Sequence, residues 1–316
     1  MKQYSKTDES FSFLFLVIPI TFVIVGVLFF PYKSMYLFQR FQEPDLLLQT
    51  VVLFSSLLCL FLGFFWKAKN TENYLKMAGW FGFSFFWATK INELYYGEGE
   101  DIVNAFLCIA GIFLLCYVAY HEWITTKGEK HVRCLNWAAG VAATAGLIYF
   151  VVELTPLAYW LVDVVTVQSA ALLNLIIGNV ETEGNVILYD GAYVVNIIFA
   201  CTAIQSIVIF VGGILPLSQV EWKRKMYGLL ITIVPIYFLN LFRNALIALL
   251  VKDNPDMFFM AHNVIGKGLS LVALVLLLLI VSKRIPELFD EIICLSDLPK
   301  RNGPLEQQLK RLWRKS

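Results

Sequence analysis

The chain has 316 residues, of which 59% are hydrophobic and 16% are charged, and its formal net charge is +1. Soluble domains usually carry about 25% charged residues, so this composition excludes an ordinary soluble protein and indicates an integral membrane protein. The nearly neutral charge gives no indication of nucleic-acid binding, and no cysteine pair has the CxxC spacing of a metal site. We therefore expect no nucleic-acid partner, no metal and no cofactor.

Eight apolar stretches are long enough to cross a membrane as helices. The first is too long for the core of a signal peptide, so we keep it as a span. Lys76 and Lys90 shorten the third apolar stretch to near the lower limit for a transmembrane helix, about 17 residues. We predict an all-α integral membrane protein with about eight transmembrane helices, at 11–30, 46–66, 74–91, 102–120, 135–152, 194–217, 226–251 and 262–282.

A further apolar segment, 157–177, contains Asp163, Gln168 and Asn174, and hydropathy alone does not decide whether it crosses. The positions of lysine and arginine favour one answer. If the N-terminus is inside and 157–177 does not cross, most basic residues fall on the inner side and the outer loop 153–191 has none. We therefore expect both termini in the cytoplasm, with 157–177 lying on or dipping into the outer face of the cell membrane.

The approach to the sixth span has two readings. Residues 185–196 contain two β-rich runs around Asp190-Gly191, which is a strong signal for a β-hairpin. With a hairpin at 186–197, the helix begins close to Cys201, and a helix N-terminus favours the thiolate form of a cysteine. The alternative is one continuous helix over 192–217 with a buried, inert cysteine.

Three chemically active side chains fall at the outer edge of the last three spans. Cys201 lies in the outer part of the sixth span, and His262 begins the eighth. Arg243 is eight residues before the end of the seventh span, about 12 Å along the helix. An arginine within a span is unfavourable by roughly 2.5–3.5 kcal/mol on insertion scales, which makes it a functional candidate.

Each of these residues also has a structural explanation. Cys201 alone fits a small packing residue. Arg243 fits a side chain that reaches the interface, or a partner for Asp163 or Asp256. His262 fits an interfacial residue at the start of a helix.

Taken together, the three residue types are those needed for acyl transfer. A thiolate attacks a carbonyl, a histidine takes and returns the proton, and a fixed cation stabilises the oxyanion. The sequence therefore predicts a cysteine acyl-transfer site facing the outside of the membrane. We expect a five-span region over 1–152, an extracytoplasmic loop over 153–191, a three-span catalytic core over 192–285 and a basic cytoplasmic tail over 286–316.

Three sequence blocks resemble the signature blocks of the exosortase/archaeosortase family. They are Ala200–Ser206 (ACTAIQS), Asn240–Asn244 (NLFRN) and His262 with Gly266. The cysteine block is most similar to that of the archaeosortase A group, although Ala203 stands where a glycine is more usual. The resemblance implies Cys201 as nucleophile, Arg243 as transition-state stabiliser and His262 as general acid and base, with Arg284 a second candidate for the third position. It also implies supporting roles for Thr202, Gln205, Ser206, Asn240 and Asn244.

The resemblance implies a sortase-like transpeptidase. Its substrates would be secreted surface proteins of the S-layer type, each with a C-terminal signal made of a short motif, a transmembrane helix and a basic tail. Cys201 would form a thioester with the protein, and a lipid acceptor would release it as a lipid-anchored product. The acidic outer loop 153–191 could seat the substrate or be an ordinary solvated loop.

Two other functions remain open from the sequence. A transporter or channel could place Arg243 and His262 along a polar path. A membrane cysteine protease would use the same site to cleave, with water as the acceptor.

Overall fold

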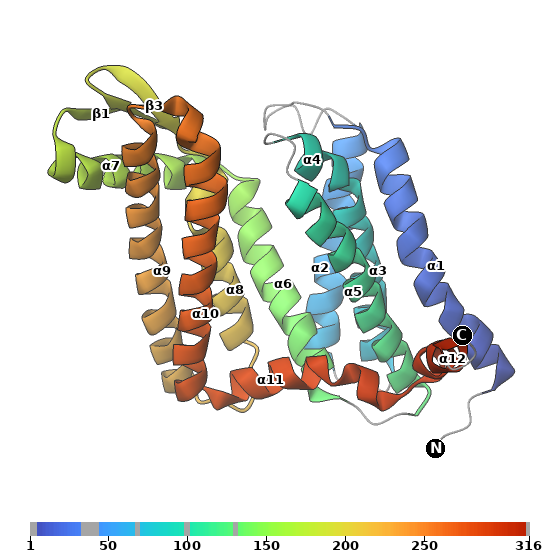
Figure 1. Ribbon diagram of the computed structural model, residues 1–316. Helices are drawn as coiled ribbons and strands as arrows, with labels where there is room; N and C mark the ends of the chain where they lie inside the picture. Colours follow the sequence, from blue (N-terminus) through green and yellow to red (C-terminus); the bar gives the residue numbers. More distant parts are fainter. Residues whose placement is uncertain (1–4, 33–43, 67–69, 98–101, 129–131, 314–316) are drawn as a thin grey trace. The chain divides into compact units, whose positions relative to one another are not determined.

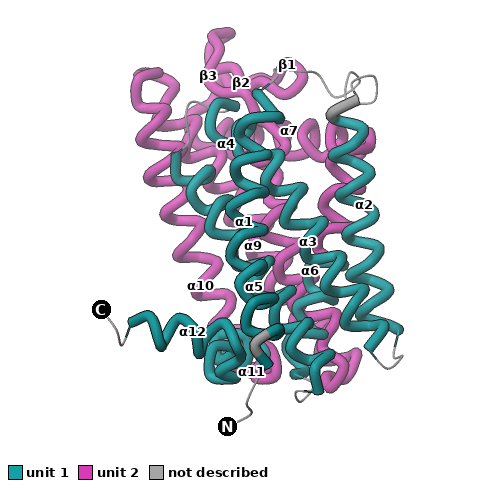
Figure 2. The backbone as a smooth tube through the Cα atoms, turned by 90° about the vertical axis from the view of Figure 1, so that its right-hand side faces the viewer, with its two compact units in different colours: residues 1–143, 291–316 teal, residues 144–290 magenta. Residues whose placement is uncertain are grey.

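A computed structural model describes residues 5–32, 44–66, 70–97, 102–128 and 132–313. These residues divide by their contacts into two units: unit 1 is 1–143 with 291–316, and unit 2 is 144–290 (Figure 2). The four functional regions expected from the sequence stay predictions.

Unit 1 is a helical bundle closed by the C-terminal segment. Its elements are α1 (Lys6–Phe29), α2 (Pro44–Phe65), α3 (Thr71–Thr89), α4 (Ile91–Tyr96), α5 (Ile102–Thr126), the first part of α6 (Arg133–Glu153), the end of α11 (Pro286–Ser296), a 3-10 turn (Leu298–Arg301) and α12 (Pro304–Trp313).

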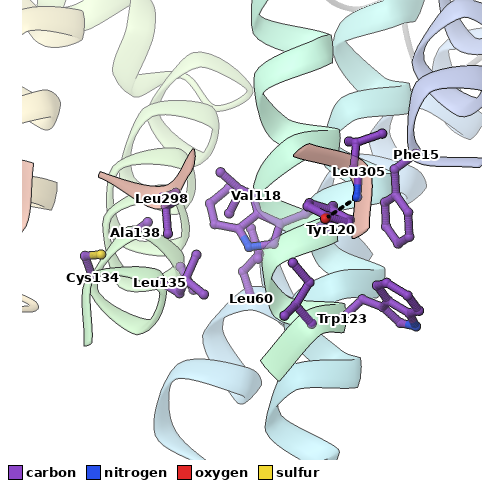
Figure 3. Packing of buried hydrophobic residues seen from close by; sticks show 14 of the residues in the cluster. Phe15, Leu60, Val118, Tyr120, Trp123, Cys134, Leu135, Ala138, Leu298 and Leu305 are labelled. Carbon is purple, nitrogen blue, oxygen red and sulfur yellow. Dashed lines mark hydrogen bonds between the residues drawn. The ribbon is translucent and has the colours of Figure 1, made fainter. Parts of the chain in front are cut away.

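The core of unit 1 is aromatic. Phe15 of α1 lies 5.4 Å from Tyr120 and 5.7 Å from Trp123 between ring centroids (Figure 3). Gly26 lies directly against the backbone of Ala88, so α1 and α3 approach more closely than any side chain would permit. Small residues commonly allow such close helix contacts in membranes.

The C-terminal segment packs into unit 1 through a buried carboxylate. Glu306 accepts hydrogen bonds from the hydroxyls of Tyr117 at 2.7 Å and Tyr120 at 2.8 Å. The backbone N–H of Leu305 donates to the same Tyr120 hydroxyl at 2.9 Å (Figure 3). Residues 304–306 are therefore a packed part of the bundle.

Two pairings in unit 1 had no signal in the sequence. Lys76, expected to limit the third span, is fully buried and forms an ion pair of 3.3 Å with Glu122 of α5. Pairing is what makes a charge tolerable inside a bundle. Cys134 and Cys294, 160 residues apart, form a disulfide.

Unit 2 combines long helices with a small sheet. It holds the end of α6, α7 (Leu157–Ile177), β1 (Val180–Glu183), β2 (Val186–Tyr189), β3 (Ala192–Asn196), a 3-10 turn (Phe199–Cys201), α8 (Ile204–Ile214), α9 (Trp222–Val251), a 3-10 turn (Pro255–Met257), a π-helical segment (Met260–Gly266), α10 (Lys267–Arg284) and the start of α11.

The three strands form an antiparallel sheet in the order β1-β2-β3. Asp190 and Gly191 both have positive φ, at 50° and 74°, and they join Tyr189 to its partner Ala192. A two-residue turn of this kind matches the twist of a hairpin. The alternative of one helix over 192–217 is wrong, because 192–196 is β3 and α8 begins only at Ile204.

Seven helical stretches among the described residues are long and apolar enough to cross a membrane, whereas about eight spans were expected. They are Thr7–Phe29, Leu46–Phe65, Ile102–Thr126, Arg133–Glu153, Leu157–Ile177, Trp222–Val251 and Pro255–Arg284. The sixth expected span is missing from this set because α8 has only 11 residues, and α3 is also absent from it.

Helix α7 qualifies as a span by length and composition, although it was expected not to cross. In Figure 1 it runs crosswise to α9, at the end of α9 where the sheet lies. A crosswise helix is the arrangement expected at a membrane face, and the placement of 157–177 on the outer face stays a prediction.

Candidate active site

Cys201 ends a 3-10 turn between β3 and α8. Cys201 is only 6% exposed, and it belongs to the same buried cluster as Leu241 and Ala245 of α9. The hydroxyl of Thr202 donates to the carbonyl of Phe199 at 2.7 Å and closes the turn. The thiol therefore precedes the first turn of α8, where the positive end of a helix dipole stabilises an anion.

Ala203 places the start of α8 by an unusual backbone conformation. Its φ is 66° and its ψ is −4°, in the left-handed region. For a residue with a Cβ this region is unfavourable by roughly 1–2 kcal/mol, and glycine adopts it freely. The glycine that the resemblance of the cysteine block leads us to expect at this position would avoid the strain, which this chain carries at Ala203.

Two asparagines of α9 hold the backbone of Cys201. The Nδ2 of Asn240 donates to the Cys201 carbonyl oxygen at 2.7 Å, and the Nδ2 of Asn244 donates to the same oxygen at 3.0 Å. The two lie four residues apart, so they share one helical face. Both were expected only as supporting residues, and their shared acceptor makes them positioning residues for the candidate nucleophile.

Arg243 lies on α9 between the two asparagines that bind the Cys201 carbonyl. Its Nε also approaches Gly266, in the π-helical segment that contains His262. Its Nε is buried and makes no hydrogen bond within the described part of the chain. In that same part neither Asp163 nor Asp256 forms an ion pair with it, so the reading of Arg243 as a simple structural partner has no support.

The close fit of Arg243 depends on Gly266. A Cβ added at Gly266 would lie 3.0 Å from the Nε of Arg243 and 3.1 Å from the carbonyl oxygen of Ala261. The glycine that accompanies His262 in the third sequence block therefore leaves room for the guanidinium.

His262 lies in the π-helical segment Met260–Gly266 that opens the last span. Its ring stacks on Phe258 with a centroid distance of 5.2 Å and an interplanar angle of 12°. π-Helical turns occur frequently at functional sites, because the wider turn redirects side chains. Arg284, the second candidate for this role, is the last residue of α10, about 27 Å along that helix. Its carbonyl accepts a hydrogen bond from Arg224.

The other expected residues of the cysteine block lie at the start of α8. Gln205 donates to the hydroxyl of Tyr149 at 3.2 Å. Ser206 lines a cavity together with Ala203, Asn240 and Arg243. Asp163, Glu181, Glu183 and Asp190 of the outer loop are exposed.

The one group among the described residues with the geometry of metal ligands lies elsewhere. It consists of Cys134, Glu291 and Cys294 in unit 1. Because the two cysteines form a disulfide and Glu291 pairs with Arg133, these side chains are already engaged.

Unit 2 thus brings a thiol, a guanidinium and an imidazole to one place. The side-chain amides of Asn240 and Asn244 bind the backbone of Cys201, and Arg243 lines an adjacent cavity. This set can support nucleophilic attack on a carbonyl with stabilisation of the resulting oxyanion.

Comparisons with known proteins agree with the resemblance of the three blocks. A family model described as transmembrane exosortase matches residues 6–279. Archaeosortase A of Haloferax volcanii is 25% identical over 250 residues, which cover 67% of this chain and 80% of the relative. Archaeosortase A of Natronomonas pharaonis is 25% identical over 253 residues, covering 68% and 77%. No solved structure matches the chain significantly. This multi-pass membrane protein belongs to the transmembrane exosortase family.

Proposed function

We propose that the protein is a membrane cysteine transpeptidase. It cleaves the C-terminal tripartite sorting signal of secreted surface proteins and transfers those proteins to a lipid anchor. The observation that carries the proposal is the position of Arg243. It lies on α9 between Asn240 and Asn244, which both bind the Cys201 carbonyl, and against Gly266 of the segment that holds His262. Membership of the exosortase family and similarity to two archaeosortases support it.

The first half of the reaction forms a thioester. His262 takes the proton of the Cys201 thiol, and the sulfur attacks the carbonyl carbon of the scissile peptide bond. Arg243 stabilises the negative charge that develops on the carbonyl oxygen. When the peptide bond breaks, His262 returns its proton to the departing amine. The signal's transmembrane helix leaves, and the protein stays on Cys201.

The second half reverses these roles with a new amine. The acceptor's amine attacks the thioester carbonyl and loses a proton to His262, and an amide forms as the bond to sulfur breaks. The Cys201 thiolate then recovers a proton from His262. A cysteine protease would differ only here, with water in place of the amine.

The site belongs to the extracellular face in this proposal. Lysine and arginine are absent from 153–191, the stretch that leads into the site, and abundant at the C-terminus. A transporter is less well supported, because the cavity beside Arg243 is lined mainly by leucine, isoleucine, valine and phenylalanine side chains.

Cys201→Ala in the native host tests the proposal, with the size and membrane attachment of the surface proteins as readout. We expect a signal-bearing protein to accumulate unprocessed while the variant enzyme remains folded in the membrane. Arg243→Lys should fail nearly as badly, because an ammonium group does not reproduce the planar guanidinium. Cys108→Ala is the control, since that cysteine packs in unit 1. Normal processing in Cys201→Ala would refute the proposal.

A further inference from the structure

The cavity beside the candidate site is an apolar groove with one polar end. It has a volume of about 500 Å³ and is formed by the start of α8, the middle of α9 and most of α10. Ser206, Asn240 and Arg243 supply polar side chains where it adjoins Cys201. The hydroxyl of Ser270, also in the lining, donates to the carbonyl of Gly266. The rest of the lining is apolar: Ala203, Ile236, Leu239, Phe242, Leu246, Leu269, Val272, Ala273, Leu274, Leu276, Leu277 and Ile280.

The groove runs along the helices, away from the site. On α10 its lining extends from Leu269 to Ile280, which is about 17 Å of helix. Residues on its rim are exposed, among them Val272 at 58% and Leu276 at 54%. In a multi-pass membrane protein such exposed apolar side chains face lipid hydrocarbon, so the groove opens sideways into the bilayer.

The size of the groove decides between two apolar occupants. A transmembrane helix is about 30 Å long and 10–12 Å across, a cylinder of roughly 2,500 Å³. This is about five times the cavity volume of about 500 Å³, so the helix of a sorting signal could lie across the open side of the groove but could not enter it. A single hydrocarbon chain is narrow enough, and its apolar surface matches the lining.

We propose that the groove between α8, α9 and α10 holds one hydrocarbon chain of the acceptor lipid. This inference rests on the proposed transpeptidase function. A chain seated there brings the lipid's headgroup to the polar end, where Asn240 and Arg243 adjoin Cys201. The amine of that headgroup is then held close to the thioester, and such positioning lowers the entropic barrier to attack.

Filling the groove should separate the two halves of the reaction. Ala273 is a small, partly buried residue of its lining, so Ala273→Trp places an indole where the chain would lie. Val275→Trp is the matched control, because Val275 is 48% exposed on the same helix and outside the lining. Each enzyme is reconstituted in vesicles that contain an amine-bearing lipid and is given a peptide with a sorting signal.

Two products are measured for each enzyme: peptide transferred to lipid, and peptide released by hydroxylamine, a small soluble nucleophile that needs no groove. For Ala273→Trp we expect lipid transfer to fall by about tenfold or more, which is at least about 1.4 kcal/mol. Hydroxylamine-dependent release should stay near the wild-type rate, and Val275→Trp should change neither product. An equal fall in both products, or no change in either, overturns the inference.

A binding measurement covers the case in which Ala273→Trp does not fold. A lipid with a photoreactive group in its hydrocarbon chain should label α9 and α10 at groove-lining residues of the wild-type protein, and in Cys201→Ala as well, because binding precedes chemistry. Labelling confined to residues outside the groove overturns the inference. If the wild type cleaves the peptide but never attaches it to lipid, the proposed transfer function fails, whatever the labelling result.

Discussion

The two asparagines on α9 allow a sharp test of how the nucleophile is positioned. Asn240 and Asn244 donate to one acceptor, the carbonyl oxygen of Cys201, at 2.7 and 3.0 Å. The perturbations are Asn240→Ala, Asn244→Ala and the double variant. Because the donors share an acceptor, each single variant leaves the carbonyl with one hydrogen bond and the double variant leaves it with none from α9.

The expected magnitudes follow from that difference. The loss of one of the two hydrogen bonds costs about 1 kcal/mol of free energy. If this cost appears in the activation free energy because Cys201 is displaced, the cleavage rate falls about fivefold. The double variant removes both side-chain donors of α9 from one buried carbonyl, and this poorer hydrogen bonding adds about 1–3 kcal/mol. We therefore expect the cleavage rate of the double variant to fall about a hundredfold or more. Two independent fivefold effects would lower it only about 25-fold.

The assay is cleavage of a sorting-signal peptide by purified enzyme in vesicles, with thermal unfolding measured in parallel. Thr232→Ala is the matched control, because Thr232 is a buried polar residue of α9 whose hydroxyl bonds only within its own helix. A double variant no slower than the product of the single effects would refute the reasoning, since the asparagines would then act independently.

Three further predictions concern single positions. Gly266→Ala should lower cleavage at least tenfold with little change in unfolding temperature, because its Cβ would crowd Arg243; unchanged cleavage would contradict this. Ala203→Gly should relieve left-handed strain and raise stability by up to about 1 kcal/mol in thermal unfolding; a less stable variant would contradict this. Glu306→Ala should destabilise unit 1 by about 2–3 kcal/mol in denaturant unfolding, because two tyrosine hydroxyls lose their acceptor. Burial raises the pKa of Glu306, but the His121 imidazole at 3.4 Å and the hydrogen bonds from the two tyrosines lower it by more, so its net pKa lies below 4.5. Stability from this carboxylate should be complete above pH 4.5 and be lost as the pH falls through the lowered pKa. Glu306→Ala should lack this acid-dependent loss, and an unchanged pH profile would refute the assignment.

Local signals in the sequence indicate the class of protein and predict the residues of the candidate site. Hydropathy indicates helices in a membrane because each apolar stretch carries its own signal. Asp190-Gly191 indicates a turn because positive φ at two adjacent positions suits few residue pairs. The blocks around Cys201, Arg243 and His262 pointed to the family before any fold was considered. Each of these signals depends on residues that are close together in the sequence, so it can be recognised without knowledge of the tertiary contacts.

The hydrogen bonds that hold those residues in place depend on the packing of separate helices, which the sequence pattern does not show. The bonds from Asn240 and Asn244 reach Cys201 across 39 and 43 residues, and the pattern of α9 alone does not say which backbone oxygen lies opposite. In the sequence Lys76 looks like the limit of a span, because its charge is visible there and its ion-pair partner on another helix, Glu122, is not. In each case the partner is fixed by the packing of separate helices, and hydrogen bonds and ion pairs form only between groups that this packing brings within a few ångströms.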